Sequence, residues 1–339
     1  MFSEERFFAT LGINVTKFEP HPLLRNSHVM TVAGALLPRS TPELRRTEAR
    51  LFEVEAGTRL LARCHWQPEP SSSPTLALVH GLEGSSESTY MRTLAMKAFA
   101  AGFNVVRINQ RNCGGSELLT ATLYNSGLSA DFRAVLFELI ERDKLPQIVF
   151  VGYSMGGNLV LKMAGELGAA APRELRAIGA VCPTLDLAAC VDAIARRENW
   201  FYQWHFVRHL KSRMRRKARL FPGQFKLDGM KHVRTVREFD EAITAPCCGY
   251  RNAADYYEKA SAMRVVRRIA VPTLIITSKD DPVVPFESFG ALEIAGNPQI
   301  EVAATEFGGH CAFISRLSGV ERYWAEARLV EFCIGHVLV

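Results

Sequence analysis

A pentapeptide of the pattern Gly-x-Ser-x-Gly, Gly152-Tyr153-Ser154-Met155-Gly156, stands between an apolar run and a run with helical periodicity. The apolar run, residues 147–151, is typical of a buried strand, and residues 155–168 are expected to form a helix. A serine on such a tight turn adopts strained backbone angles, and the positions two before and two after it need small residues. The pattern therefore predicts a serine hydroxyl raised above the edge of a sheet, at the N-terminus of a helix.

Strand-like runs alternate with helix-like runs through most of the chain. This alternation predicts right-handed βαβ units and a mainly parallel sheet with helices on both faces. Strands are expected at residues 51–55, 60–66, 75–80, 103–109, 147–151, 177–182, 272–278 and 300–305, and helices at about 89–101, 128–142, 155–168 and 320–336.

The interval of about 186–263 breaks this rhythm, since it has helical patterns and no obvious strand. We interpret it as a helical cap inserted above the sheet. The chain is then a single α/β domain with an N-terminal extension, a core in two parts and the cap, because no linker separates two independent units. The expected bounds are 1–50 for the extension, 51–185 and 264–339 for the core, and about 186–263 for the cap.

The charge is concentrated in one segment. The chain has a formal net charge of +6, but residues 196–237 contain thirteen Lys and Arg against two acids, a net of +11, so the remainder totals −5. Three interpretations compete: a solvated helix face, a site for an anionic substrate or lipid surface, and a nucleic-acid site. Of these, nucleic-acid binding is the least expected.

The composition and the first residues indicate a cytoplasmic protein. No stretch approaches 18 uninterrupted apolar residues, and the first six residues carry acids where a signal peptide needs an apolar core. The eight cysteines include no CxxC pair, so they are expected to be reduced and packed as small apolar residues.

A serine hydroxyl needs a base to remove its proton, and an acid to orient that base. In this architecture the partners follow in the order serine, acid, histidine. Of the nine histidines, His310 and His336 come late enough, and we favour His310 because it lies in a loop after a predicted strand, whereas His336 falls in the last helix. Asp280 and Asp281 both follow the strand at 272–278, and we favour Asp281.

The oxyanion of an acyl-transfer intermediate needs two hydrogen-bond donors. We expect them to be the backbone N–H groups of Met155 and of Leu82, the latter in the glycine-containing loop 80–84. No metal or organic cofactor is required. His205 and His209 share a helix face, but the sequence offers no third ligand, so a metal there is not expected.

These motifs resemble the α/β-hydrolase fold, and specifically the YheT-like hydrolases (the AB hydrolase-4 group). The resemblance implies a serine hydrolase or esterase that uses Ser154, Asp281 and His310, with short- to medium-chain acyl esters or monoacylglycerol-like lipids as substrates. An acyltransferase, or a non-catalytic binding protein on the same scaffold, remains an alternative. The segments that carry the resemblance are 21–28, 80–84, 111–115, 152–158, 237–240, 244–250, 255–257 and 280–310.

The predicted cap suggests how the substrate is chosen. It is rich in aromatic residues, which can line an acyl pocket or simply pack the cap onto the sheet. Together with the basic cluster, they suggest an acyl ester that has an anionic group or is presented at an anionic lipid surface. The residues concerned are Trp200, Phe201, Trp204, Phe206, Phe221 and Phe225, with Arg213, Arg215 and Arg216. The oligomeric state does not follow from the sequence.

Overall fold

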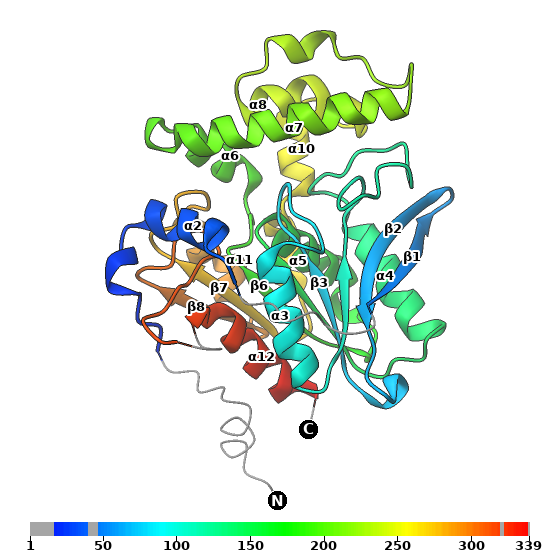
Figure 1. Ribbon diagram of the computed structural model, residues 1–339, viewed down its shortest axis with the longest axis vertical. Helices are drawn as coiled ribbons and strands as arrows, with labels where there is room; N and C mark the ends of the chain where they lie inside the picture. The colour runs from blue at the N-terminus through cyan, green and yellow to red at the C-terminus, as the bar shows by residue number, and fades with distance from the viewer. Residues whose placement is uncertain (1–16, 40–46, 319–321, 338–339) are drawn as a thin grey trace, which may run out of the picture.

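The computed structural model describes residues 17–39, 47–318 and 322–337. Eight strands form one sheet in the order β1-β2-β4-β3-β5-β6-β7-β8 (Figure 1). β2 pairs antiparallel with β1 and β4, and all other neighbours are parallel. The strands are β1 (Glu48–Glu55), β2 (Thr58–His65), β3 (Thr75–Val79), β4 (Asn104–Ile108), β5 (Ile148–Tyr153), β6 (Leu175–Val181), β7 (Thr273–Ser278) and β8 (Ile300–Thr305).

Helices cover both faces of the sheet, as the alternation of elements predicts. On one face, α3 (Thr89–Ala100) and α12 (Trp324–Val337) share a hydrophobic core, and on the other face α4 (Ser129–Glu141) and α5 (Met155–Leu167) share a second one (Figure 1). β5 feeds both cores, because successive side chains of a strand point to opposite faces. This explains why its sequence is apolar without interruption.

The regular elements between β6 and β7 are all helical, and those within residues 187–260 lie on one side of the sheet, above it in Figure 1. We refer to them as the cap. They are α6 (Leu187–Ala195), α7 (Trp200–Leu220), α8 (Val236–Phe239), the π-helix η6 (Asp240–Thr244), α9 (Ala245–Cys247) and α10 (Ala253–Ala260), with 3-10 turns η4 (Arg197–Asn199) and η5 (Asp228–Lys231). Two further 3-10 turns, η7 (Ala262–Arg264) and η8 (Val266–Arg268), lead from the cap to β7 and pack against α5.

The N-terminal segment contributes a helix that sequence patterns did not predict. α2 (Ser27–Leu36) begins at Asn26, whose side-chain oxygen accepts hydrogen bonds from the backbone of His28 and Val29. It follows the 3-10 turn η1 (Pro22–Leu24). The remaining short elements are η2 (Pro70–Ser72), η3 (Gly168–Ala170), η9 (Phe286–Gly290) and α11 (Leu292–Ala295).

Element boundaries differ slightly from those predicted. β1 begins at Glu48, three residues before the predicted start, and β5 continues to Tyr153, directly before the serine. α12 begins at Trp324 and not at 320, and residues 319–321 lie outside the described ones. None of the helices in the described part of the chain is long and apolar enough to cross a bilayer.

Candidate active site

Ser154 occupies the turn between β5 and α5 with φ of 52° and ψ of −119°. Non-glycine residues rarely adopt positive φ, so the surrounding chain must hold this conformation. The two flanking glycines leave the necessary space: a Cβ atom on Gly152 would come 2.2 Å from Gly156 O, and one on Gly156 would come 2.4 Å from Val79 O. The predicted strained turn is therefore present, and it points Ser154 away from the sheet.

His310 lies within hydrogen-bond distance of two predicted partners. Its Nε2 atom is 2.9 Å from Ser154 Oγ, and its Nδ1 atom is 2.9 Å from Asp281 Oδ2. Only 13% of the His310 side chain and none of the Asp281 carboxylate is exposed. The structure thus brings together a hydroxyl, an imidazole and a carboxylate in one hydrogen-bonded chain, shielded from most solvent. Such a chain can accept the hydroxyl proton and return it to another oxygen.

The two neighbouring aspartates have different partners. Asp281 binds the imidazole through Oδ2, while its Oδ1 accepts hydrogen bonds from the backbone N–H groups of Val283 and Val284. Asp280 instead accepts a 3.0 Å hydrogen bond from the backbone of Gly309, next to His310. Asp281 orients the ring, and Asp280 supports the loop that carries it.

The electrostatic environment favours the protonated form of His310. Burial alone would lower its pKa, but the charge of Asp281 and the hydrogen bond to it outweigh burial and raise the pKa above 6.5. A positive charge on this imidazole would therefore be stabilised by the Asp281 carboxylate.

The two residues predicted to provide the oxyanion donors lie in the wall of one pocket with Ser154. Leu82 and Met155 line the same pocket as Ser154, and in the described ranges neither backbone N–H donates a hydrogen bond to another main-chain group outside the regular elements. The loop of Leu82 lies close to Ser154, because a Cβ atom on Gly81 would come 3.2 Å from Ser154 Cβ. The loop is held there by a hydrogen bond from Gly81 N–H to Tyr90 Oη.

His80 fixes the start of that loop. Its Nδ1–H donates to Gly81 O at 2.8 Å, while its Nε2 accepts from Gln110 N–H at 3.1 Å. Complete burial lowers the pKa of His80 to about 4, so the ring is neutral at pH 7 and keeps both bonds.

Glu83, the residue after Leu82, binds the cap. Its carboxylate forms a two-point ion pair with Arg213 of α7, at 2.9 and 3.1 Å, and accepts a hydrogen bond from Tyr124 Oη. Arg213 also stacks over the Tyr124 ring, 5.1 Å from its centroid. Both side chains of this ion pair are largely buried. The pair therefore connects the loop that contains Leu82 to helix α7 of the cap.

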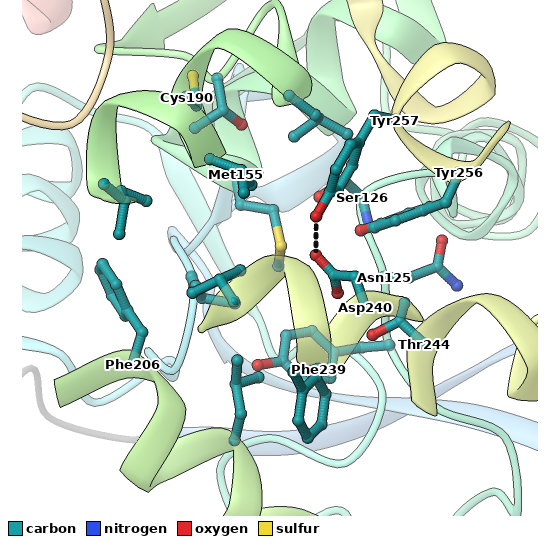
Figure 2. A pocket seen from close by; sticks show the side chains of 18 of the residues that line it. Asn125, Ser126, Met155, Cys190, Phe206, Phe239, Asp240, Thr244, Tyr256 and Tyr257 are labelled. Atoms are coloured by element: carbon teal, nitrogen blue, oxygen red, sulfur yellow. Dashed lines mark hydrogen bonds between the residues drawn. The ribbon is translucent and has the colours of Figure 1, made fainter. Parts of the chain in front are cut away.

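A pocket lies beside Ser154, between the sheet and the cap, and Figure 2 shows part of its wall. Most of the wall is apolar, and α6, α7 and α8 supply the larger share of its apolar residues. A smaller polar part includes Asp240, whose carboxylate accepts a 2.8 Å hydrogen bond from Tyr257 Oη (Figure 2). Burial raises the pKa of Asp240 to about 6. The lining residues include Leu187, Cys190, Val191, Ile194, Phe206, Leu210, Met214, Phe239, Asn125, Ser126, Thr244 and Tyr256.

The basic and aromatic residues of the cap divide into two groups. Arg213 forms an ion pair with Glu83 and Arg216 forms one with Glu117, whereas Arg215 has no ion-pair partner among the described residues. Of the six aromatic cap residues considered, only Phe206 lines this pocket, whereas Trp200, Phe201 and Trp204 are exposed. The aromatic content of the cap therefore reflects neither a wholly aromatic pocket nor packing alone.

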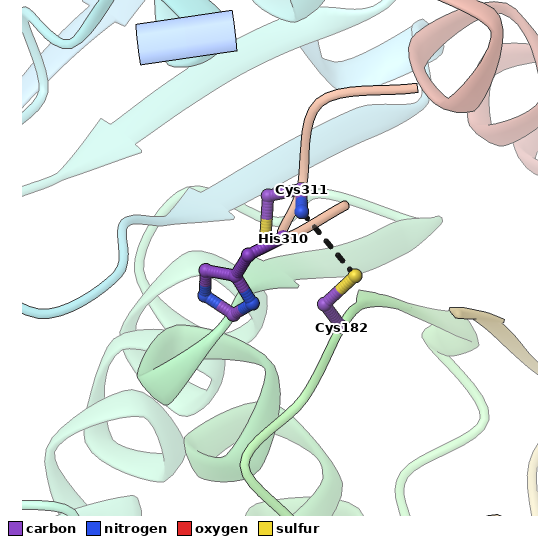
Figure 3. A group of neighbouring side chains, drawn as sticks. All are labelled: Cys182, His310 and Cys311. Atoms are coloured by element: carbon purple, nitrogen blue, oxygen red, sulfur yellow. Dashed lines mark hydrogen bonds between the residues drawn. The ribbon is translucent and has the colours of Figure 1, made fainter. Parts of the chain in front are cut away.

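Cys182, His310 and Cys311 lie close enough to share a soft metal ion, with ligand atoms within 4.8 Å of one another (Figure 3). Both nitrogens of His310 already face Ser154 and Asp281, and burial raises the pKa of the Cys182 thiol well above 9, which keeps it protonated and a poor ligand. Cys182 Sγ instead accepts a hydrogen bond from Cys311 N–H and so supports the histidine loop (Figure 3). His205 and His209 belong to no cluster of three potential ligands among the described residues.

The family follows from comparison with known proteins. The model of the alpha/beta hydrolase fold family matches residues 74–317, well over half of the chain. The chain belongs to the α/β-hydrolase family. This agrees with the resemblance that the sequence motifs indicated.

Among curated relatives, this α/β-hydrolase is 34% identical over 272 residues to "Putative esterase YheT" of Escherichia coli, with 79% of each chain covered. It is 30% identical to "Medium-chain fatty acid ethyl ester synthase/esterase 2" of Saccharomyces cerevisiae, covering 76% of this chain and 61% of that one. It is 28% identical to "Phospholipase ABHD3" of Mus musculus, covering 73% and 60%. The chain thus spans about three fifths of these two eukaryotic relatives.

Solved structures support the fold. The α/β-hydrolase superposes on the esterase Pf2001 of Pyrococcus furiosus with a TM-score of 0.57 at 15% identity, covering 87% of this chain and 96% of that one. At this identity the likeness concerns the fold alone.

Two features of the site were not assigned from the sequence of this α/β-hydrolase. Thr31 Oγ1 of α2 accepts a 2.8 Å hydrogen bond from the His310 backbone, so the N-terminal segment helps to hold the histidine loop. The buried pair of Asp240 and Tyr257 lies in segments 237–240 and 255–257, which carried the resemblance without a role. A buried acid beside a tyrosine was the available signal, but only the fold brings the two segments together.

Proposed function

We propose that this α/β-hydrolase is a serine hydrolase that cleaves carboxylic acyl esters through Ser154, His310 and Asp281. The observation that carries the proposal is the hydrogen-bonded chain from Ser154 Oγ through both His310 nitrogens to Asp281, at one end of a mostly apolar pocket. Relatives whose names include esterase, lipase and phospholipase support the ester as the bond attacked.

The proposed reaction has two steps. Ser154 Oγ bonds to the ester carbonyl carbon while its proton passes to His310 Nε2, and the backbone N–H groups of Leu82 and Met155 bind the resulting oxyanion. His310 then donates the proton to the leaving alcohol oxygen as the carbon–oxygen bond breaks. In the second step water attacks the acyl-enzyme, His310 takes its proton, and the acid is released with the proton returned to Ser154 Oγ.

The proposed substrates are short- to medium-chain acyl esters or monoacylglycerol-like lipids. The apolar wall from α6 and α7 suits an acyl chain. The polar part around Asp240 and Tyr257 suits the hydroxyl groups of a glycerol-type alcohol, because a buried carboxylate accepts hydrogen bonds strongly. A relative named "Monoacylglycerol lipase", from Saccharomyces cerevisiae, agrees with this assignment. Substrates of this kind are presented at a lipid surface, which forms the second part of the proposal.

Acyl transfer to an alcohol is a second candidate, favoured by the yeast relative named as an ethyl ester synthase and esterase. The same residues would serve, with an alcohol replacing water in the second step. Product analysis with and without added ethanol distinguishes the two: ethyl ester formed in preference to free acid indicates a transferase.

Labelling with a fluorophosphonate probe tests the proposal. We expect the wild type to be labelled and to hydrolyse p-nitrophenyl esters, and Ser154→Ala to lose both. Ser126→Ala is the matched control, since Ser126 lines the same pocket and is expected to keep the label. A folded Ser154→Ala protein that is still labelled, or that still hydrolyses esters at the wild-type rate, would refute the assignment.

A further inference from the structure

Helix α7 carries a line of residues that no part of the proposed reaction uses. Because they are spaced three or four positions apart, they lie on one side of the helix. We call them the outer stripe: Trp200, Trp204, Arg208, Lys211 and Arg215. Phe206, Leu210 and Arg213, which line the substrate pocket, lie on the other side of the helix.

The first part of the outer stripe is aromatic and exposed. Trp200 is 65% exposed and Trp204 is 49% exposed, and the adjacent Phe201 is 43% exposed. Exposed large apolar groups that gather in one place mark interaction sites. Tryptophan is also enriched where proteins meet the membrane–water interface, because its ring is apolar with one polar N–H.

The second part of the outer stripe is cationic. None of Arg208, Lys211 and Arg215 has a carboxylate within ion-pair distance in the described residues, whereas Arg213 and Arg216 on other sides of the same helix are paired. The residues of the outer stripe line an open groove on the surface of the cap. The same groove is lined by Arg196, Arg197 and Arg234, and none of its lining residues is acidic. The unpaired charge of the cap is therefore concentrated beside the exposed tryptophans.

Helix α7 is connected to the site through its other side. Tyr202 of α7 stacks on His28 of α2, with ring centroids 5.8 Å apart, and the two side chains are within hydrogen-bond distance. On α2, Thr31 accepts the hydrogen bond from the backbone of His310, and Val29 is exposed. Helix α7 is thus linked through α2 to the loop of the proposed base, and the outer stripe faces away from that link.

We infer that the outer stripe docks the protein on an anionic phospholipid surface. Tryptophans enter the interfacial layer while the arginines and lysine meet the lipid phosphates, a combination typical of helices that lie on membranes. The phosphates of a nucleic acid could also bind the cations. In a duplex, however, the bases are already stacked on one another, so the exposed tryptophans of the helix would have no partner. The inference rests on the lipid-surface part of the proposed function, and it does not depend on the reaction at Ser154.

Vesicle sedimentation tests the inference. We expect the wild type to bind vesicles of phosphatidylcholine with phosphatidylglycerol more tightly than phosphatidylcholine alone, and to be released by salt. Arg208→Gln with Arg215→Gln is expected to weaken binding by about 30-fold. Trp200→Ser with Trp204→Ser is expected to weaken it at both low and high salt.

The matched control is Arg142→Gln with Arg173→Gln, which removes the same charge from exposed residues near the amino ends of β5 and β6, away from the cap. It is expected to bind vesicles like the wild type. Hydrolysis of a soluble p-nitrophenyl ester is expected to be unchanged in all three double variants, so a failed reaction and failed docking give different results. Three results would overturn the inference. They are equal vesicle binding by all variants, no vesicle binding by the wild type at low salt, and tighter binding of the wild type to duplex DNA than to the anionic vesicles.

Discussion

At the scale of single residues, we expect substitution of Asp281 to affect catalysis much more than substitution of its neighbour Asp280. His310 must be neutral to take a proton, so activity falls as the pH decreases through its pKa. Asp281 raises that pKa, which places the acidic limb of the pH–rate profile above pH 6.5. We expect Asp281→Asn to move the limb to lower pH and to reduce kcat by about 10⁴-fold, because the ring loses its orienting charge.

Asp280→Asn is the matched control for this change. An asparagine oxygen can still accept the hydrogen bond from Gly309 N–H, so we expect a wild-type pH limb and a small loss in kcat. Both profiles are measured as kcat/KM for a soluble ester. Equal effects of the two substitutions would contradict the separate roles of the neighbouring acids.

Single residues were predictable where the chain itself imposes the geometry. Ser154 could be recognised because the strained turn demands glycines at 152 and 156, and that requirement is local. The partners could be chosen only by order along the chain, since His310 meets Ser154 across 156 positions. Thr31 could not be found this way, because α2 contacts the histidine loop without any sequence pattern that links them.

At the scale of elements, the loop after β3 and helix α7 are coupled by Glu83 and Arg213. Removing one partner leaves the other charge buried without compensation, which costs more than removing both. We expect Arg213→Met and Glu83→Gln each to lower kcat/KM through a displaced Leu82 N–H, and the double variant to recover part of the loss. A double-mutant cycle on kcat/KM is expected to give a coupling of about 1–3 kcal/mol.

The control for this pair is Arg216→Met with Glu117→Gln, an ion pair that joins α7 to the chain between β4 and α4 and in which neither residue lines the pocket. It is expected to leave kcat/KM near the wild-type value. Additive losses for Glu83 and Arg213, or equal losses in the control pair, would show that the cap does not act through this loop.

Elements were predicted well where periodicity is strong and poorly where packing decides. β3, β5 and β7 are buried on both faces and were predicted within two residues of their observed bounds. The helical structure of the cap was predicted. The division of its cations into some that form ion pairs and others that face outward was not predicted. The sequence contains thirteen cations between 196 and 237, yet only the orientation of α7 decides which of them meet Glu83 and Glu117 and which face outward.

At the scale of the whole molecule, the stability of the fold depends in part on keeping the buried His80 neutral. His80 lies beneath the loop at the centre of the sheet, and burial lowers its pKa to about 4, against 6.5 for an exposed ring. The unfolded chain therefore binds more protons between these values, so the free energy of unfolding falls as the pH decreases through this range. From pH 7 to pH 5 this site alone accounts for about 2 kcal/mol.

We therefore expect denaturant unfolding of the wild type to show a steeper loss of stability between pH 7 and pH 5 than that of His80→Gln. The variant is less stable at pH 7, because it loses the bonds to Gly81 O and Gln110 N–H, but its dependence on pH is shallower by about 2 kcal/mol over this interval. His209→Gln, on the exposed side of α7, is the control and should keep the wild-type slope. A variant slope equal to that of the wild type would mean that His80 does not remain neutral in the folded protein, and the loop that carries Leu82 would then be held by a charged ring.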